Sequence, residues 1–421
     1  MNQMMTISEA AGQLSVSIDT IRRWEKKGLI KAHRDSRNNR IFGVKELQRA
    51  HSKYIGGSVD NRFNILKSND AAGYSSIELF AGAGGLALGL ENAGFNHQLL
   101  VEFDKQAAST LKNNRPDWNV QCIDASKVDF KPYRDKVDVV TGGFPCQAFS
   151  YAGNQLGFDD ARGTLFFELA RCIKEVNPKV AVGENVRGLV AHENGRTLQL
   201  MLKILDDLGY RAEFRILRAQ YLDVPQKRER LIIIAARKDL DLTIYFPREK
   251  DYTVSLREAL ENVPDSPHQK YSAKKKIVLD MVPPGGYWRD LPLDVQREYL
   301  GGSFNLSGGK TGMARRLSWD EPSLTLTCAP AQKQTERCHP DVTRPLAVRE
   351  YARLQTFPDD WHFEGSVGSQ YKQIGNAVPV NLGFHVGRCV AAMLKRCPDS
   401  DMEVVDQVDN IIKPPQADFF N

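Results

Sequence analysis

One cysteine, Cys146, stands in the glycine-rich stretch GGFPCQAFS at residues 142–150. The residues before it, Val137-Asp138-Val139-Val140, have the pattern of a short buried strand, so the thiol is expected just beyond the end of that strand. Cysteine is often an inert small hydrophobe in a protein core. The alternative is that Cys146 is a nucleophile, and the rest of the sequence has to decide between the two interpretations.

A carboxyl group and two guanidinium groups are expected near this thiol. Residues 179–183 predict another strand, which delivers Glu184 to its end. The stretch QKRERLIIIAA at 226–236 predicts a further strand, on which Arg228 and Arg230 share one face because side chains alternate. Ligands of open α/β sheets bind at the carboxyl ends of the strands. The sequence therefore places a thiol, a carboxyl group and paired arginines at one edge of a sheet.

A cofactor site is predicted on the same edge. The stretch SIELFAGAGGLALGL at 76–90 reads as a strand, a glycine-rich turn and an apolar helix, which lets the backbone approach a ligand closely. No GK[ST] follows, so the turn is not a phosphate-binding P-loop, whereas a dinucleotide fold stays possible. Glu102 and Asp124 each follow an apolar run, in positions suited to ribose hydroxyls and to an adenine amino group. Either acid alone could be a capping residue, but the three features in order predict an adenosine-type cofactor.

The elements that carry these residues alternate between strand and helix, which predicts an α/β fold with a mostly parallel sheet. The chain has 421 residues, enough for two or three domains. No apolar run approaches the roughly 18–20 residues of a membrane span, and the N-terminus lacks a signal pattern, so we expect a cytoplasmic protein that does not contact membranes. The seven cysteines form no CxxC pair, and Cys328, Cys338 and His339 match no zinc spacing, so we predict neither a disulfide framework nor a metal site.

The first fifty residues form a basic head. They hold ten Lys and Arg against five Asp and Glu, and this excess of +5 equals the net charge of the whole chain. Thr6 and Glu9 have the spacing of a capping box, which predicts a first helix with the apolar stripe Ile7, Ala10, Ala11 and Leu14. A second helix is capped by Ser17 and ends at Gly28. Its Ile18, Ile21 and Trp24 are expected to face inward, and Arg22, Arg23, Lys26 and Lys27 outward. A hairpin with Asn38-Asn39 at its tip follows.

This head resembles the winged helix-turn-helix of the MerR and excisionase type, which implies that Arg22, Arg23 and Lys26 contact DNA. The alternative is a helical hairpin that contacts protein.

Five short segments follow one another along the chain: FAGAGG, GGFPCQAFS, ENV, QKRER and IGNAVP (374–379). They match, in residue types and in order, the motifs of bacterial DNA (cytosine-5) methyltransferases, the modification enzymes of restriction–modification systems. The chain resembles that family over roughly residues 75–395, and the basic head lies outside the match. The resemblance implies a Rossmann-like methyltransferase fold, with a mixed, mostly parallel sheet and helices on both faces. It also implies S-adenosyl-L-methionine as cofactor and double-stranded DNA as substrate.

The resemblance assigns roles to particular residues. Cys146 would add to C6 of a flipped cytosine, Glu184 would protonate N3 with a raised pKa, and Arg228 and Arg230 would hold the base oxygen and a flanking phosphate. Residues implied at the cofactor are Phe80, Gly82, Gly84, Glu102, Phe103, Asp124, Pro145 and Asn376. Residues implied at the DNA beside the nucleophile are Gln147 and Ser150. One departure is Glu78, where the family usually has aspartate; little effect is expected, because the charge is kept.

The predicted organisation is a head at 1–55, a linker at 56–73, a catalytic domain at 74–240 and 326–398, a target-recognition domain at 241–325, and a disordered or peripheral tail at 399–421. In the recognition domain, Lys310, Arg315 and Arg316 are candidates for DNA contact, with phosphate binding favoured over base readout for each. Residues 348–355 predict a structural helix.

Two other functions stay open. The same scaffold could methylate cytosine in RNA, although the recognition-sized insert and the DNA-binding head argue against it. The chain could also be mainly a transcriptional regulator with a degenerate enzyme body, although intact Cys146, Glu184, Arg228 and Arg230 argue against that. The head itself could repress the operon's own promoter or add affinity at methylation sites. We expect a monomer on its methylation site, with dimerisation through the head as an alternative.

Overall fold

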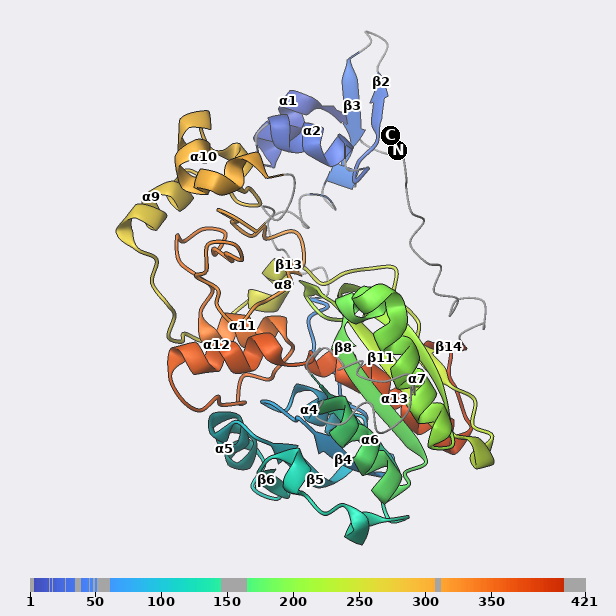
Figure 1. The fold of residues 1–421 in the computed structure, drawn as a ribbon. Helices are drawn as coiled ribbons and strands as arrows, with labels where there is room; N and C mark the ends of the chain where they lie inside the picture. The colour runs from blue at the N-terminus through green and yellow to red at the C-terminus, as the bar shows by residue number, and fades with distance from the viewer. Residues whose placement is uncertain are drawn as a thin grey trace, which may run out of the picture. The chain divides into compact units, whose positions relative to one another are not determined.

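The structure is a computed structural model (Figure 1), and it divides the chain into two compact units, residues 1–62 and 63–421, which are described separately. The described residues are 4–14, 16, 18–26, 28–34, 39–44, 46–47, 50, 61–144, 165–306 and 312–404.

The first unit is a small helical pair with a three-stranded sheet. Its elements are β1 (Met4–Thr6), α1 (Ile7–Gln13), α2 (Ile18–Lys26), β2 (Ala32–Arg34) and β3 (Arg40–Gly43), with sheet order β1-β3-β2. The predicted capping box is present, since Thr6 and Glu9 exchange side-chain and backbone hydrogen bonds. Gly28 has the expected left-handed backbone at φ 70°. The predicted hairpin is confirmed by the antiparallel pairing of β2 with β3, whereas β1 was not anticipated.

One residue of the predicted inward face of α2 is misplaced. Ile21 and Trp24 are buried with Ala10 in the core of this unit, but Ile18 is 38% exposed. It is the first residue of α2. Ser17, Lys27 and Asn38 lie outside the described residues.

The second unit is built on a seven-stranded sheet in the order β6-β5-β4-β7-β8-β11-β9. The strands are β4 (Ser75–Leu79), β5 (Asn96–Glu102), β6 (Val120–Cys122), β7 (Val139–Gly143), β8 (Val180–Val186), β9 (Tyr210–Arg218) and β11 (Glu229–Arg237). Neighbouring strands from β6 to β8 pair in parallel, and β11 pairs antiparallel with both β8 and β9. This is the mixed, mostly parallel sheet that the sequence predicts.

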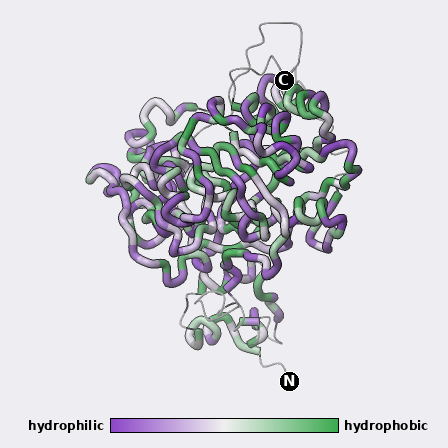
Figure 2. Tube along the Cα trace, turned by 90° about the horizontal axis from the view of Figure 1, so that it is seen from below, coloured by the Kyte–Doolittle hydropathy of each residue, from purple (hydrophilic) through white to green (hydrophobic). Residues whose placement is uncertain are grey.

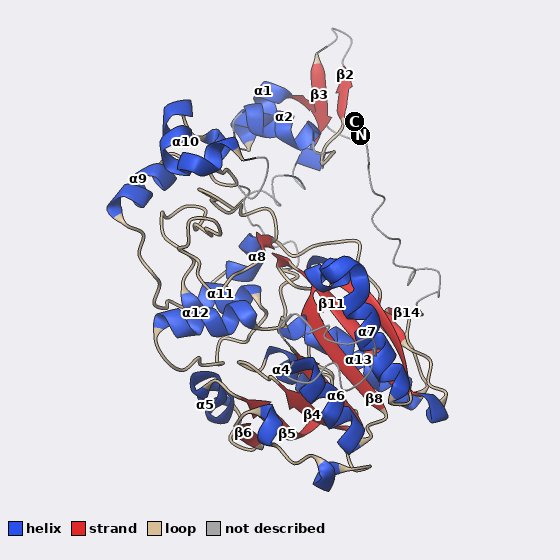
Figure 3. Ribbon diagram, in the orientation of Figure 1, coloured by secondary structure: helices blue, strands red, loops and turns tan. Residues whose placement is uncertain are grey.

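Helices cover both faces of this sheet, as Figures 1 and 3 show. The helices are α4 (Gly85–Asn92), α5 (Lys105–Asn114), α6 (Leu165–Val176), α7 (Arg196–Asp207) and α13 (Val380–Lys395). On β11, Leu231 and Ile233 belong to the core beneath α6 and α7, whereas Ile232 and Ile234 belong to the core beneath α4 and α13. A strand buried on both faces has apolar residues without alternation, which explains the run LIIIAA.

The remaining elements form the inserted region and its return to the sheet. They are β10 (Gln226–Lys227), β12 (Tyr245–Pro247), α8 (Leu256–Leu260), α9 (Ala273–Asp280), α10 (Leu293–Leu300), β13 (Ser323–Leu324), α11 (Val348–Leu354), α12 (Val367–Asn376) and β14 (Met402–Val404). The insert has its own small core around Trp288, Leu279 and Met313. The hydropathy of the chain trace can be followed in Figure 2.

Both predicted peripheral segments are partly ordered. Phe63, Ile65 and Leu66, in the predicted linker, pack against the cores of the second unit. In the predicted tail, β14 pairs with β12. Among the described residues, the stretch Val367–Lys395 is apolar and long enough to cross a membrane, but 89% of its most apolar window is buried inside the fold, as expected of core helices.

Candidate active site

The end of β7 lies directly beside Glu184. Gly143 of β7 is the register partner of Glu184 on β8. A Cβ atom at position 143 would lie 3.0 Å from Oε2 of Glu184, so glycine leaves the space that this carboxyl group occupies. The buried Asn185 side chain donates a hydrogen bond of 2.8 Å to the carbonyl of Phe144. The segment that leads to Cys146 is thereby fixed to β8, a role of Asn185 that the sequence analysis did not identify.

The predicted nucleophile lies beyond this point. Cys146, together with Pro145, Gln147 and Ser150, lies outside the described residues. Cys146 follows Gly143 by three positions in the sequence. Gly143 and Phe144 are therefore the residues through which the structure describes the approach to Cys146.

Glu184 and Arg230 form a buried ion pair. Nε of Arg230 lies 2.8 Å from Oε1 of Glu184, and both side chains are 12% exposed. Arg230 reaches this position because β11 runs antiparallel to β8, with Arg230 opposite Val186. Burial raises the pKa of Glu184, and the positive charges of Arg230 and then Arg228 oppose the shift. The direction is the one that a carboxylic acid needs to donate a proton near neutral pH.

Arg228 differs from Arg230 in its surroundings, because its side chain contacts backbone carbonyls and not a carboxyl group. Its side chain is 1% exposed. Its guanidinium group donates to the carbonyls of Gly375 and Ala377 at 3.1 and 3.0 Å, and more weakly to that of Leu326 at 3.4 Å. Burial lowers its pKa to about 9, so it is still charged at neutral pH. The sequence analysis could not identify these backbone acceptors, because they lie in segments far from Arg228 along the chain.

The glycine-rich turn after β4 has the geometry of a ligand cradle. Phe80, Gly82 and Gly84 all have positive φ angles, of 59°, 56° and 90°. Space beside Gly82 is open, because a Cβ atom there would meet nothing within 4 Å. The backbone N–H of Gly82 donates to Glu102 at 2.7 Å, which ties the turn to the end of β5. The turn therefore leaves room for a ligand next to a carboxylate.

The other predicted cofactor residues stand at the ends of β5, β6 and α12. Glu102 also accepts from the N–H of Asp104 at 2.7 Å, and burial raises its pKa against these two donors. Phe103 is 74% exposed, an unusual state for a large aromatic side chain. Asp124 binds Ser126 through Oδ1. Oδ1 of Asn376 accepts a hydrogen bond from the Cys328 thiol at 2.9 Å. An exposed ring, two carboxylates and an open glycine turn fit an adenosine-type cofactor.

Glu78, below the cradle, does not keep its charge as predicted. It is buried in β4, where Thr141 is a hydrogen-bond donor at 3.4 Å. Burial raises its pKa to about 8, so the group is mostly protonated at neutral pH.

A pocket of about 330 Å³ opens beside Arg230. It is lined by Val186, Arg187, Gly188, Arg218, Gln220, Lys227, Arg228, Glu229, Arg230 and Thr325. Arg187 and Lys227 are held in ion pairs with Glu229 and Glu321, at 2.7 and 2.8 Å. Basic side chains in exposed pairs can exchange a carboxylate for a phosphate at little cost, so this pocket suits a nucleic-acid backbone. The sequence analysis missed Arg187 and Arg218, whose only signal was their charge.

The two candidate arginines of the insert have different environments. Arg316 is buried and donates to the carbonyls of Leu279, His339 and Pro340, which contradicts the prediction of DNA contact. Arg315 is half-buried, with its guanidinium over the ring of Tyr287 at 5.3 Å. Arg315 therefore stays a candidate for DNA contact, and Lys310 lies outside the described residues.

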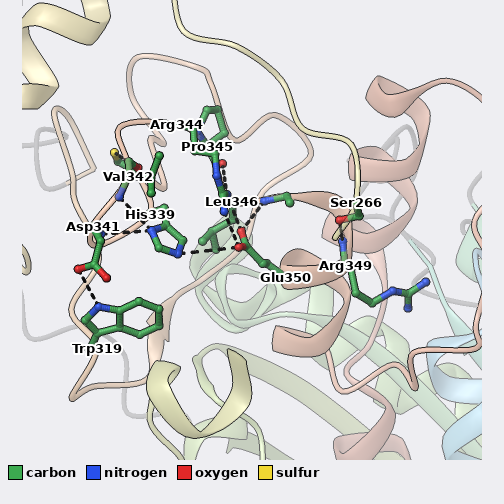
Figure 4. Close-up of polar contacts among 12 residues, drawn as sticks. Ser266, Trp319, His339, Asp341, Val342, Arg344, Pro345, Leu346, Arg349 and Glu350 are labelled. Atoms are coloured by element: carbon green, nitrogen blue, oxygen red, sulfur yellow. Dashed lines mark hydrogen bonds and ion pairs between the residues drawn. The ribbon is translucent and has the colours of Figure 1, made fainter. Parts of the chain in front are cut away.

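A polar cluster holds residues 339–344 against α11 (Figure 4). Arg344 donates to both oxygens of Glu350 at 2.7 and 2.6 Å. Nδ1 of His339 accepts the backbone N–H groups of Asp341 and Val342. Residues 339–344 of the return segment are thus attached to the predicted helix at 348–355, which the structure confirms as α11.

On the head, Arg22 and Arg23 of α2 are exposed at the surface, as predicted. Lys26 is the last residue of α2, and its side chain lies outside the described part of the structure.

Comparison with known proteins gives two family matches. The C-5 cytosine-specific DNA methylase family matches residues 74–391, and the MerR family of regulatory proteins matches residues 6–42. The type II methyltransferase M.Eco47II of Escherichia coli is 55% identical over 408 residues, which cover 94% of this chain and 97% of that relative. The type II methyltransferase M.Sau96I of Staphylococcus aureus is 50% identical over 341 residues, covering 79% of this chain and 78% of that relative.

Among solved structures, the Dnmt2 methyltransferase of S. pombe superposes with a TM-score of 0.53 at 17% identity, over 77% of this chain and 98% of that chain. A DNMT2 mutant of Spodoptera frugiperda gives a TM-score of 0.55 at 17% identity, over 75% of this chain and 99% of that chain. These two similarities concern the fold alone.

Proposed function

The chain belongs to the C-5 cytosine-specific DNA methylase family and is a type II DNA cytosine-5 methyltransferase, and from this premise we propose how its residues act. The observation that carries the proposal is the buried Glu184 carboxyl group, paired with Arg230 and in register with Gly143, three residues before Cys146. Family membership implies S-adenosyl-L-methionine as the methyl donor.

The cytosine ring needs activation, because its C5 carbon is a poor nucleophile. The Cys146 thiolate adds to C6, and a bond forms between sulfur and carbon. The displaced ring electrons move toward N3, where Glu184 donates a proton, and the resulting enamine has electron density at C5. Arg230 holds the base oxygen and balances the developing charge. After methyl transfer a base removes the C5 proton, the ring double bond reforms, and the thiolate leaves.

Bound S-adenosyl-L-methionine supplies an electrophilic methyl group to C5. Glu102 would accept the ribose hydroxyls, Asp124 the adenine amino group, and Phe103 would pack against the adenine ring. The supporting observations are the open space beside Gly82 and the exposure of Phe103.

The target cytosine must leave the DNA stack to reach this site, so we include base flipping in the proposal. The basic pocket formed by Arg187, Arg218 and Lys227 lies beside Arg230 and would hold the backbone next to the flipped nucleotide. Methylation of this kind would protect DNA from a cognate restriction endonuclease.

The covalent step is tested with the Cys146→Ser variant in a host without DNA methylation. Bisulfite sequencing of that host's genome should show 5-methylcytosine in one short motif with the wild-type chain and none with the variant. The purified variant should still bind S-adenosylhomocysteine and DNA. Turnover near the wild-type level would rule out Cys146 as the nucleophile, and methylation of RNA in place of DNA would favour the other substrate.

The acid role is tested with Glu184→Gln. General acid assistance is typically worth roughly 10²–10⁴, so kcat should fall by at least a hundredfold with little change in DNA affinity. Because burial raises the pKa of Glu184, wild-type activity should hold above the usual carboxyl range and fall as the pH rises through that raised pKa. The variant should lack this alkaline limb. A loss below tenfold, or an unchanged pH profile, would contradict the role.

We propose a second function for the head, repression of the operon's own promoter. The observations that favour it are the MerR-family match at residues 6–42 and the exposed Arg22 and Arg23 on α2. In a promoter–reporter assay, the double variant Arg22→Ala and Arg23→Ala should lose repression and keep methylation. Cys146→Ser should keep repression, since the effect requires binding only. If deletion of residues 1–60 leaves promoter binding and expression unchanged, the regulatory role is wrong. Added affinity at methylation sites is the alternative, and it would appear as a steeper salt dependence of DNA binding by the full chain than by the deletion variant.

A further inference from the structure

Asn376 is held from several sides by groups outside its own helix. The carbonyls of its two neighbours, Gly375 and Ala377, both accept hydrogen bonds from one terminal nitrogen of Arg228. The carbonyl of Ala377 also accepts from Gln355 at 3.0 Å, and the same Gln355 amide donates to Ile374 at 2.7 Å. The backbone on each side of Asn376 is therefore fixed by buried donors.

The donors are themselves interlocked. Gln226, two residues before Arg228, donates to Oε1 of Gln355 at 2.9 Å and accepts from the backbone N–H of Leu326 at 2.9 Å. Gln226 and Gln355 are fully buried. Nε of Arg228 is buried without a hydrogen-bond partner, but loss of any contact named above would leave a further donor or acceptor unsatisfied, which favours one arrangement of the network.

The side chain of Asn376 has its own contact. The thiol of Cys328 donates to Oδ1 of Asn376 at 2.9 Å. Because the thiol occupies the amide oxygen, the amide nitrogen is the group of Asn376 that an acceptor on the cofactor would bind. Cys328 follows Leu326 by two residues, so the segment that carries the thiol is attached to the same network.

We propose that Arg228 is a positioning residue for the cofactor, acting through Asn376, and that the Cys328 thiol fixes the orientation of the Asn376 amide. The inference rests on the proposed role of Asn376 at the cofactor. It separates the two arginines of the QKRER stretch by function: Arg230 serves the target base through Glu184, and Arg228 serves the cofactor loop. Since Arg228 and Arg230 are two residues apart, the start of β11 and the residue before it connect the base site to the cofactor site.

The test measures the affinity of the full chain for S-adenosylhomocysteine by titration calorimetry, without DNA. Arg228→Lys keeps the charge, but its side chain is shorter and lacks the second terminal nitrogen that donates to Leu326, so its Kd should rise about tenfold, the equivalent of about 1.4 kcal/mol. In steady-state assays the same variant should raise KM for the methyl donor more than it lowers kcat. Arg230→Lys should show the reverse, a lower kcat with Kd unchanged. A merely structural Arg228 would lower thermal stability without this split.

The thiol provides an independent test that does not depend on how Arg228→Lys folds. Cys328→Ala removes the donor and should raise the Kd about threefold, whereas Cys328→Ser keeps a donor and should restore most of the affinity. The matched control is Cys397→Ser, an exposed cysteine elsewhere.

Two outcomes overturn the inference in distinguishable ways. If Asn376→Ala weakens binding but Arg228→Lys and Cys328→Ala do not, the clamp is wrong and the cofactor role of Asn376 stands. If Asn376→Ala itself leaves the Kd unchanged, the role of Asn376 fails and the inference fails with it.

Discussion

At the scale of single residues, burial decides what each charged group near the site can do. Arg228 and Arg230 stand two positions apart, yet one is bound to backbone carbonyls and the other to a carboxyl group. Glu184 and Glu78 are both buried acids with raised pKa values, but only Glu184 has an arginine against it. Residue type and spacing therefore do not separate the groups that act on substrate from those that hold the site together.

Glu78 gives a stability prediction with a defined sign. Its pKa is about 8 in the folded chain against an ordinary value of 4.5, so the folded state binds one more proton between these pH values. The stabilisation of the folded state by this proton is complete below pH 4.5. It is lost as the pH rises to about 8, by up to roughly 1.4 kcal/mol per pH unit. Glu78→Gln should remove this loss.

Urea unfolding of both chains from pH 5 to pH 8 measures the effect. The advantage of Glu78→Gln over the wild type should grow with pH across this range. Asp360→Asn, at an exposed carboxyl group, is the control and should show no such trend. A constant difference between wild type and Glu78→Gln would mean that the buried carboxyl group does not titrate as described.

At the scale of elements, the sequence predicts what depends on local pattern. The βαβαβ order, the capping box at Thr6 and the hairpin of the head were predictable, because periodicity and turn residues determine them. The predicted strand end at Glu184 was too early, because β8 continues to Val186 through its pairing with β11. The contacts of Arg228 were not predictable, since its acceptors lie in Gly375, Ala377 and Leu326, and no local pattern reports such contacts. Leu66 was assigned to a linker for the same reason, because its packing against the core of the second unit is a long-range contact that its local sequence does not indicate.

The crossing of α4 and α13 is a second case of long-range packing. A Cβ atom at Gly89 would lie 2.6 Å from the carbonyl of Val380 and 2.7 Å from Gly383. Backbone cannot yield as a flexible side chain can, so Gly89→Ala must push the helices apart. Overpacking of this kind typically costs about 1–3 kcal/mol. α4 begins at the cofactor turn, so affinity for S-adenosylhomocysteine should fall together with Tm.

Calorimetric melting and ligand titration of Gly89→Ala check this expectation. Gly302→Ala is the matched control, because a Cβ atom there meets nothing within 4 Å. An unchanged Tm for Gly89→Ala would show that the two helices have room that the glycine contact does not suggest.

At the scale of the whole molecule, the boundary between the two units falls at residue 62, within the stretch predicted as a linker. Residues just after it belong firmly to the catalytic unit. The fully buried Asn381 on α13 accepts from the N–H of Leu66 at 3.0 Å and donates to the carbonyl of Asn64 at 2.8 Å. The same side chain donates to the carbonyl of Asp223, in the turn before β10. One amide thus ties the entry segment to the strand that leads to Arg228 and Arg230.

Two truncations that differ by five residues should therefore behave differently. A chain that begins at Phe63 keeps Asn64, Leu66 and the apolar anchors, so it should fold, bind S-adenosylhomocysteine and methylate DNA with kcat near that of the full chain. A chain that begins at Ser68 leaves Asn381 with unsatisfied groups and exposes apolar surface, a loss of a few kcal/mol. Its Tm should drop by several degrees, and its kcat should fall because Asn381, which also holds the turn at Asp223, loses two of its partners. Equal stability of the two truncations would mean that the entry segment is an attachment without influence on the site, and a loss of activity already at Phe63 would mean that the head takes part in methylation.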